Sequence, residues 1–140
     1  YEYRMSRTKD PFDPLFSWYY PHSLNLETMQ KATAILLRHD DFSSFSKHHT
    51  QVKTRICRID LAEWTAEGDK LIFRIRADRF LRNMVRAIVG TLLDIGRGHL
   101  TPDDLHAILE GRDRSLAGFS VPACGLTLME IGYPDDIRTT

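Results

Sequence analysis

The 140-residue sequence is poor in cysteine, has no net charge and contains no long apolar run, and each absence narrows what the protein can be. Cys57 and Cys124 stand outside any CxxC or Cys/His spacing, so we favour two reduced thiols in a cytoplasmic protein over a disulfide. Because 19 basic residues balance 19 acidic ones, any nucleic-acid signal must come from their distribution. No apolar run approaches the roughly 20 residues that span a bilayer, so no membrane contact is expected.

The first residues, Tyr1 to Met5, have neither an initiator methionine nor the apolar core of a signal peptide. Aromatic and polar side chains alternate there, which is typical of the interior of a strand. We therefore expect the sequence to continue upstream in a longer protein. A length of 140 residues fits a single domain, so 1–140 is treated as one domain.

Hydrophobic periodicity and turn residues predict an α+β domain, in which helices pack on one face of an antiparallel sheet. Helices are expected at 26–38, 79–95 and 102–110. Strands are expected at 1–5, 55–64, 70–77 and 126–133. Asn25 is a good N-cap for the first helix, and Thr101 followed by proline marks the start of the last. Residues 8–25, rich in proline and aromatics, are expected to form an extended loop.

The predicted helix 79–95 has an apolar stripe for the core and a row of arginines on its opposite side. The row is Arg79, Arg82 and Arg86, with Gly90 one turn further on, where a small residue allows close approach of a backbone or a ligand. Asp78 can reach Arg82, but no acidic residue lies three or four positions from Arg86. Two interpretations stay open: a solvated basic face, or a face that takes a carboxylate or phosphates from elsewhere.

Residues 80–90, FLRNMVRAIVG, resemble the F-x-x-x-M-V-R-x-I-V-G motif of tRNA pseudouridine synthases of the TruA type. Three further segments resemble family motifs in the same order: 1–3 a Y-x-Y strand, 41–45 a D-F-[ST]-S-F segment, and 112–126 a D-R…P-A-x-G-L segment. Each match alone is weak, whereas four in order over nearly the whole chain are specific. The chain is therefore identified as the C-terminal part of the catalytic core of this family.

The resemblance implies an isomerase that converts uridines of the tRNA anticodon arm to pseudouridine without a metal or an organic cofactor. The C1′–N1 bond breaks, the base turns, and C5 joins the same sugar carbon. The family's nucleophile is an aspartate in a G-R-T-D-A-G-V-H motif, which this sequence lacks. The N-terminal domain with that aspartate is expected outside 1–140, and the chain alone is expected to be inactive.

The resemblance also assigns roles to single residues. Arg86 matches the arginine of M-V-R that pairs with the catalytic aspartate, and Tyr1 matches the tyrosine that stacks on the target base. Leu126 matches the leucine of G-L, and two uses stay open for it: a wall of the uracil pocket, or a plain core position. Contact with tRNA phosphates, with a solvated surface charge as the alternative, is considered for Arg79, Arg82, Lys47, Lys53 and Arg55.

The expected partner is tRNA, and the family resemblance implies a homodimer with tRNA held across both subunits. The alternative is a non-catalytic RNA-binding or dimerisation module. His48-His49 has no third ligand at useful spacing, so no metal is expected. A DNA-reading helix-turn-helix built on 102–110 is disfavoured because Asp103, Asp104 and Glu110 would face phosphates.

Overall fold

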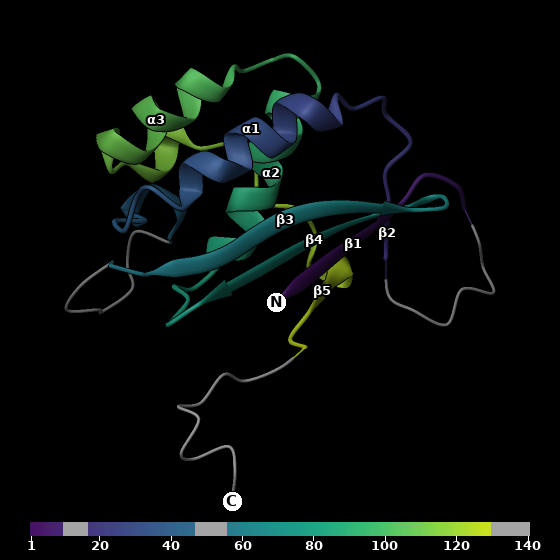
Figure 1. Cartoon of the computed structure of the whole chain (residues 1–140), viewed down its shortest axis with the longest axis horizontal. Helices are drawn as coiled ribbons and strands as arrows, with labels where there is room; N and C mark the ends of the chain where they lie inside the picture. The colour runs from purple at the N-terminus through teal and green to yellow at the C-terminus, as the bar shows by residue number, and fades with distance from the viewer. Residues whose placement is uncertain (10–16, 47–55, 130–140) are drawn as a thin grey trace, which may run out of the picture.

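Three helices lie on one face of a five-stranded sheet in the computed structural model, which describes residues 1–9, 17–46 and 56–129 (Figure 1). The strands are β1 (Glu2–Ser6), β2 (Trp18–Tyr19), β3 (Ile59–Glu67), β4 (Lys70–Ala77) and β5 (Leu126–Thr127). The helices are α1 (Leu26–Leu36), α2 (Met84–Gly96) and α3 (Pro102–Gly111). Short 3-10 turns occur at Ser43–Phe45, Arg114–Leu116 and Ala123–Gly125. The predicted α+β class, with helices on one face of the sheet, is confirmed.

The sheet has the strand order β2-β1-β4-β3, and β5 pairs with β1. Antiparallel pairing joins β1 to β4, β1 to β5, and β3 to β4. β2 runs parallel to β1, with Met5 opposite Trp18, so the sheet is mixed rather than wholly antiparallel. This strand lies within the predicted loop 8–25. It was missed because a strand of two residues, ended by Pro21, is too short for an alternating pattern to show.

The β3–β4 hairpin turns through Gly68 and Asp69, and its strands pair as far as Glu67 opposite Lys70. Gly68 has a φ of +61°, a left-handed conformation that glycine adopts without steric cost. The strand predicted at 55–64 is observed at Ile59–Glu67. It continues to Glu67 because the turn to β4 needs only two residues. The strand predicted at 126–133 is seen as β5 alone, and residues from 130 onward lie outside the described part.

Caps set the starts of α1 and α3 as predicted. The side chain of Asn25 accepts a hydrogen bond from the Thr28 amide. Thr101 and Asp104 form a reciprocal capping box at the start of α3. None of the helices in the described part has the length and hydropathy needed to cross a membrane.

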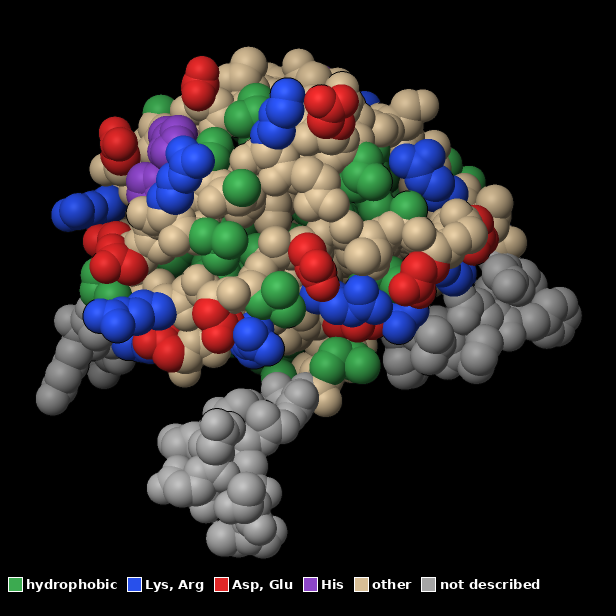
Figure 2. Space-filling view, in the orientation of Figure 1, with side chains coloured by type: hydrophobic (Ala, Val, Ile, Leu, Met, Phe, Trp, Pro, Cys, Tyr) green, Lys and Arg blue, Asp and Glu red, His purple; other side chains and the backbone are tan. Residues whose placement is uncertain are grey.

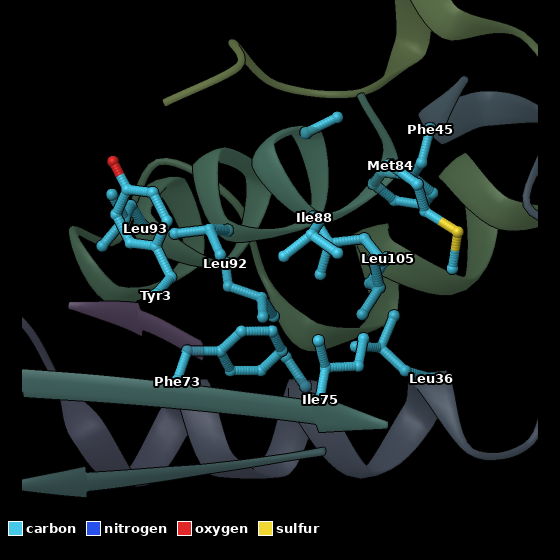
Figure 3. Close-up of a cluster of buried hydrophobic side chains, with 14 of the residues drawn as sticks. Tyr3, Leu36, Phe45, Phe73, Ile75, Met84, Ile88, Leu92, Leu93 and Leu105 are labelled. Atoms are coloured by element: carbon cyan, nitrogen blue, oxygen red, sulfur yellow. The ribbon is translucent and has the colours of Figure 1, made fainter. Parts of the chain in front are cut away.

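The core lies between the helices and the sheet. Figure 3 shows Phe73 and Ile75 of β4 beneath Ile88 and Leu92 of α2. The apolar stripe predicted for the 79–95 segment is confirmed, since all its members are at most 5% exposed: Leu81, Met84, Val85, Ile88, Leu92 and Ile95. Each aliphatic side chain that leaves water contributes about 1.5–3 kcal/mol, so this layer holds α2 firmly on the sheet.

α2 begins at Met84, later than predicted. Asn83, just before it, has a left-handed backbone with φ 69°, a conformation that asparagine tolerates better than most residues. Arg79 therefore lies in the loop after β4, and Arg82 lies in the turn that precedes the helix. The predicted row of three arginines on one helix face is wrong, because only Arg86 is on α2.

Candidate functional site

Residues from three separate parts of the chain meet in one open pocket at the N-terminal end of α2. Tyr1, Arg86 and Leu126, the three residues predicted for the centre of the site, all line it. The remaining lining residues are Phe80, Leu81, Arg82, Asn83, Met84 and Val85. The pocket holds about 410 Å³, within the roughly 300–1,000 Å³ typical of small-molecule sites, so a single nucleobase fits.

The backbone of Tyr1 is held against β4, beside the pocket. Its nitrogen donates to the Ile75 carbonyl at 2.9 Å, and the Ile75 amide donates back to the Tyr1 carbonyl at 3.0 Å. Its ring packs edge-to-face on Phe80, with 5.0 Å between ring centroids and 85° between ring planes. Phe80 was not singled out from the sequence, although it is the first residue of the matched motif. The two rings form an aromatic wall that stays partly exposed.

Arg86 is half-buried on the first turns of α2, and its side chain is tied to the chain segment that follows α3. Its Nε donates to the Val121 carbonyl at 2.7 Å, and the Val121 amide donates to the Arg86 carbonyl at 3.1 Å. This bond uses one of the five N–H donors of the guanidinium. The side chain is therefore held in one direction and is not free in solvent.

No carboxylate among residues 1–9, 17–46 and 56–129 pairs with Arg86. Other arginines in this part form ion pairs: Arg4 and Arg74 with Glu2, Arg76 with Asp60, and Arg112 with Asp41. On the face shown in Figure 2, Lys and Arg side chains are interspersed with Asp and Glu. The expected lack of a local counter-charge for Arg86 is confirmed for the described residues. A partly buried cation of this kind favours binding of an anion.

Leu126 reaches the pocket because β5 pairs with β1, placing it opposite Tyr3. It is half-buried and packs on the hydrophobic core while it also lines the pocket. The two uses left open for this residue are therefore compatible.

Tyr3 packs beside Leu126 and helps to hold residues 122–126 in place. Its hydroxyl donates to the Pro122 carbonyl at 2.6 Å, and its ring together with the Arg4 carbonyl leaves no space for a β-carbon at Gly125. Burial, and to a lesser degree the Cys124 thiol, raises the pKa of Tyr3 well above its ordinary value, although Arg86 acts in the opposite direction. Tyr3 thus stays a neutral hydrogen-bond donor that positions residues 122–126. The sequence signal for this core position is that apolar Tyr3 and Met5, two residues apart, lie on the same face of β1.

The basic residues considered for phosphate contact have different positions. Arg82 is exposed at the pocket. Arg79 is half-buried and lies near Cys57, outside the pocket lining. Lys47, Lys53 and Arg55 lie outside the described residues.

Both cysteines are free, as predicted. Cys57 is buried and Cys124 is exposed, rather than both being half-buried. Burial raises the pKa of the Cys57 thiol, while the charge of Arg79 partly opposes this, so the thiol stays protonated at neutral pH.

In the part of the chain that the structure describes, no three His, Cys, Asp or Glu side chains come together as a metal site.

Comparison with known proteins places this chain in a family. A family model described as tRNA pseudouridine synthase matches residues 32–134. A relative called tRNA pseudouridine synthase A from Parabacteroides distasonis is 50% identical, and the match covers 98% of this chain and 54% of the relative. A relative of the same name from Exiguobacterium sibiricum is 41% identical, and the match covers 96% of this chain and 54% of the relative. The chain spans about half the length of these relatives. The motif residues, the pocket that they line and these matches together show that the chain belongs to the tRNA pseudouridine synthase family.

Proposed function

We propose that this chain supplies half of the active site of an isomerase that converts uridine to pseudouridine in the anticodon arm of tRNA. One observation carries the proposal: Arg86, Tyr1 and Leu126, far apart in the sequence, line one pocket, and the arginine has no carboxylate partner in the described part. We assign the nucleophilic aspartate to an N-terminal domain outside residues 1–140. Relatives about twice as long as this chain leave room for such a domain. The complete synthase below means a protein with this chain as its C-terminal half.

In this proposal Arg86 receives the carboxylate from the other half. A guanidinium fork favours the ionised form of a carboxylate and fixes its direction through charge-assisted hydrogen bonds. The ionised carboxylate then takes part as nucleophile while the C1′–N1 bond breaks and C5 bonds to C1′. N1 gains a proton and C5 loses one, so product and substrate are isomers. The residues of this chain bind and orient groups, and none of them supplies the nucleophile.

The target base has to leave the helical stack before it can enter a pocket of this size. Tyr1 and Phe80 offer an aromatic wall for the extruded base, and Leu126 offers an apolar one. These contacts replace part of the stacking that the base loses in the tRNA.

Removing the ring of Tyr1 tests the stacking role. In the complete synthase, Tyr1→Ala is expected to lower kcat/KM by about 5- to 150-fold, the equivalent of about 1–3 kcal/mol of base stacking. Tyr1→Phe keeps the ring and is expected to stay near the wild-type value. A Tyr1→Phe variant as slow as Tyr1→Ala would show that the hydroxyl, not the ring, matters.

Arg82 is the best placed of the candidate phosphate contacts, because it is exposed at the pocket. Arg82→Ala is expected to weaken tRNA binding and to reduce the salt dependence of log K by about one unit of slope. Arg76→Ala removes an exposed arginine on β4 that does not line the pocket, and it is the matched control. Equal salt slopes for Arg82→Ala and the wild type would exclude Arg82 as a phosphate contact.

The proposal also includes a homodimer that holds tRNA across both subunits, a cytoplasmic location with the tRNA, and no metal or organic cofactor, all as implied by the family. Sedimentation of the complete synthase checks the dimer. Chromatography of nucleosides from unmodified tRNA treated with the complete synthase checks the reaction. Formation of pseudouridine supports the proposal, whereas tRNA binding without product would favour the alternative, a non-catalytic RNA-binding module.

A further inference from the structure

Residues 118–121, called the 118–121 segment below, run along α2 at backbone contact distance. At one end the Gly118 amide donates to Thr91 Oγ1 at 2.9 Å, and at the other the Val121 amide donates to the Arg86 carbonyl at 3.1 Å. Between these two bonds, the Phe119 carbonyl lies directly against Gly90, where a β-carbon would be only 1.7 Å from the oxygen. The segment therefore has little freedom to move toward the helix.

Arg114 binds this segment at two points. Its Nη1 donates to the Gly118 carbonyl at 2.9 Å, and its Nη2 donates to Ser120 Oγ at 2.9 Å. The same Ser120 hydroxyl oxygen accepts from Asn83 Nδ2 at 2.6 Å. Asn83 is the left-handed residue that immediately precedes α2. The Ser120 hydroxyl thus joins the 118–121 segment to the turn from which α2 starts, and the Arg114 guanidinium holds the segment on both sides of Phe119.

The segment ends at the atom that orients Arg86. Val121 follows Ser120 in the chain, and its carbonyl accepts the hydrogen bond from Arg86 Nε at 2.7 Å. A free arginine side chain has many rotamers, so one hydrogen bond at Nε restricts where both Nη groups can point. A shift of the Val121 carbonyl would therefore change the direction of the Arg86 guanidinium.

We propose that Arg114 is a positioning residue: through the Gly118 carbonyl and the Ser120 hydroxyl it holds the 118–121 segment so that the Val121 carbonyl aims the Arg86 guanidinium into the pocket. This inference rests on the proposed function, because the aim of Arg86 matters only if a carboxylate meets it there. Arg114 itself does not line the pocket, so it acts through Arg86 and touches neither base nor carboxylate.

The kinetic test uses the complete synthase in single turnover with tRNA in excess of its Kd. Arg114→Met is expected to slow pseudouridine formation by about 10- to 100-fold, the range that small misplacements of catalytic groups produce. The Kd for tRNA is expected to stay within about twofold. Arg97→Met, an exposed arginine at the other end of α2, is the matched control and is expected to change neither quantity.

A double variant separates positioning from plain stabilisation. Arg86→Lys keeps a charge but has no Nε–H for the Val121 carbonyl. In this variant Arg114 can no longer act on residue 86 through Val121. Adding Arg114→Met to Arg86→Lys is therefore expected to slow the reaction no further. Slowing by the same factor as in the wild-type background, or a wild-type rate for Arg114→Met alone, would overturn the proposal.

Hydrogen exchange of the complete synthase gives a readout that does not depend on activity. Arg114→Met is expected to speed exchange of the Gly118 and Val121 amides, and unchanged exchange there would contradict the inference. Ser120→Ala deletes only the shared hydroxyl and provides the same two tests if Arg114→Met lowers stability. A wild-type synthase that makes no pseudouridine would refute the proposed function, while the exchange result would still decide whether Arg114 holds the segment.

Discussion

Replacing Arg86 by glutamine in the complete synthase is expected to slow pseudouridine formation by about two to four orders of magnitude and to leave the fold intact. Removal of one pre-positioned hydrogen-bond donor from an active site lowers the rate by about two to three orders of magnitude, and loss of the charge that keeps the carboxylate ionised adds to this. The fold survives because the side chain of Arg86 makes one described hydrogen bond, to Val121, whose loss costs about 1 kcal/mol.

Arg76→Gln is the matched control for this prediction. Arg76 is an exposed arginine on β4 that pairs with exposed Asp60 at 2.9 Å, away from the pocket lining. Exposed pairs of this kind contribute about 0–1 kcal/mol, so activity should stay near the wild-type value. Circular dichroism and thermal unfolding of both variants establish that they are folded. A folded Arg86→Gln variant with wild-type turnover would show that Arg86 is only structural.

Gly90→Ala is expected to lower both stability and activity. The added methyl group would lie 1.7 Å from the Phe119 carbonyl oxygen and 2.8 Å from its carbon, and neither backbone atom can rotate away. Overpacking of this kind costs about 1–3 kcal/mol or more, which exceeds the about 1 kcal/mol that alanine gains over glycine in a helix. Moving the 118–121 segment would also displace the Val121 carbonyl that orients Arg86.

Gly96→Ala offers a control on the same helix. A β-carbon there would meet the sulfur of Met29 at 2.5 Å and a methyl group of Leu24 at 3.1 Å. The β-carbon would also lie 2.8 Å from Met29 Cγ, but all these atoms belong to side chains that can change rotamer and none to the backbone. The expected loss of stability is therefore smaller, and activity is expected to be unchanged. Thermal unfolding and single-turnover rates of the two variants measure the difference. Equal stability and activity for Gly90→Ala and the wild type would contradict the close backbone contact.

The parts of the fold that the sequence predicted are those set by local chemistry. The caps Asn25 and Thr101 depend on hydrogen bonds within four residues, and the apolar stripe of α2 depends on helical periodicity. The late start of α2 did not follow from the same pattern, because the apolar spacing of Leu81 with Met84 continues across the turn. Only the backbone of Asn83, at φ 69°, breaks the helix there.

The family motifs predicted three residues of the site, Arg86, Tyr1 and Leu126, and all three line one pocket. The contacts that hold it were not predictable. Arg86 bonds to Val121 and Asn83 bonds to Ser120 across 35 and 37 positions of the chain, and no periodicity records such pairs. The bonds of Arg114 reach only four and six residues along the chain, but they lie in a segment without helical or strand periodicity. The close approach at Gly90 was anticipated only as space for some backbone or ligand, and it is the backbone of Phe119 that occupies it.

The central claim is that Arg86 takes its carboxylate partner from outside this chain, and the release of tritium from tRNA labelled at uridine C5 tests it most directly. Bond formation at C5 expels that hydrogen, so release counts turnovers. The account predicts no release with residues 1–140 alone and steady release when an N-terminal half of the family precedes them in one polypeptide. Release by the 140-residue chain alone would contradict the account, because the nucleophile would then lie within it.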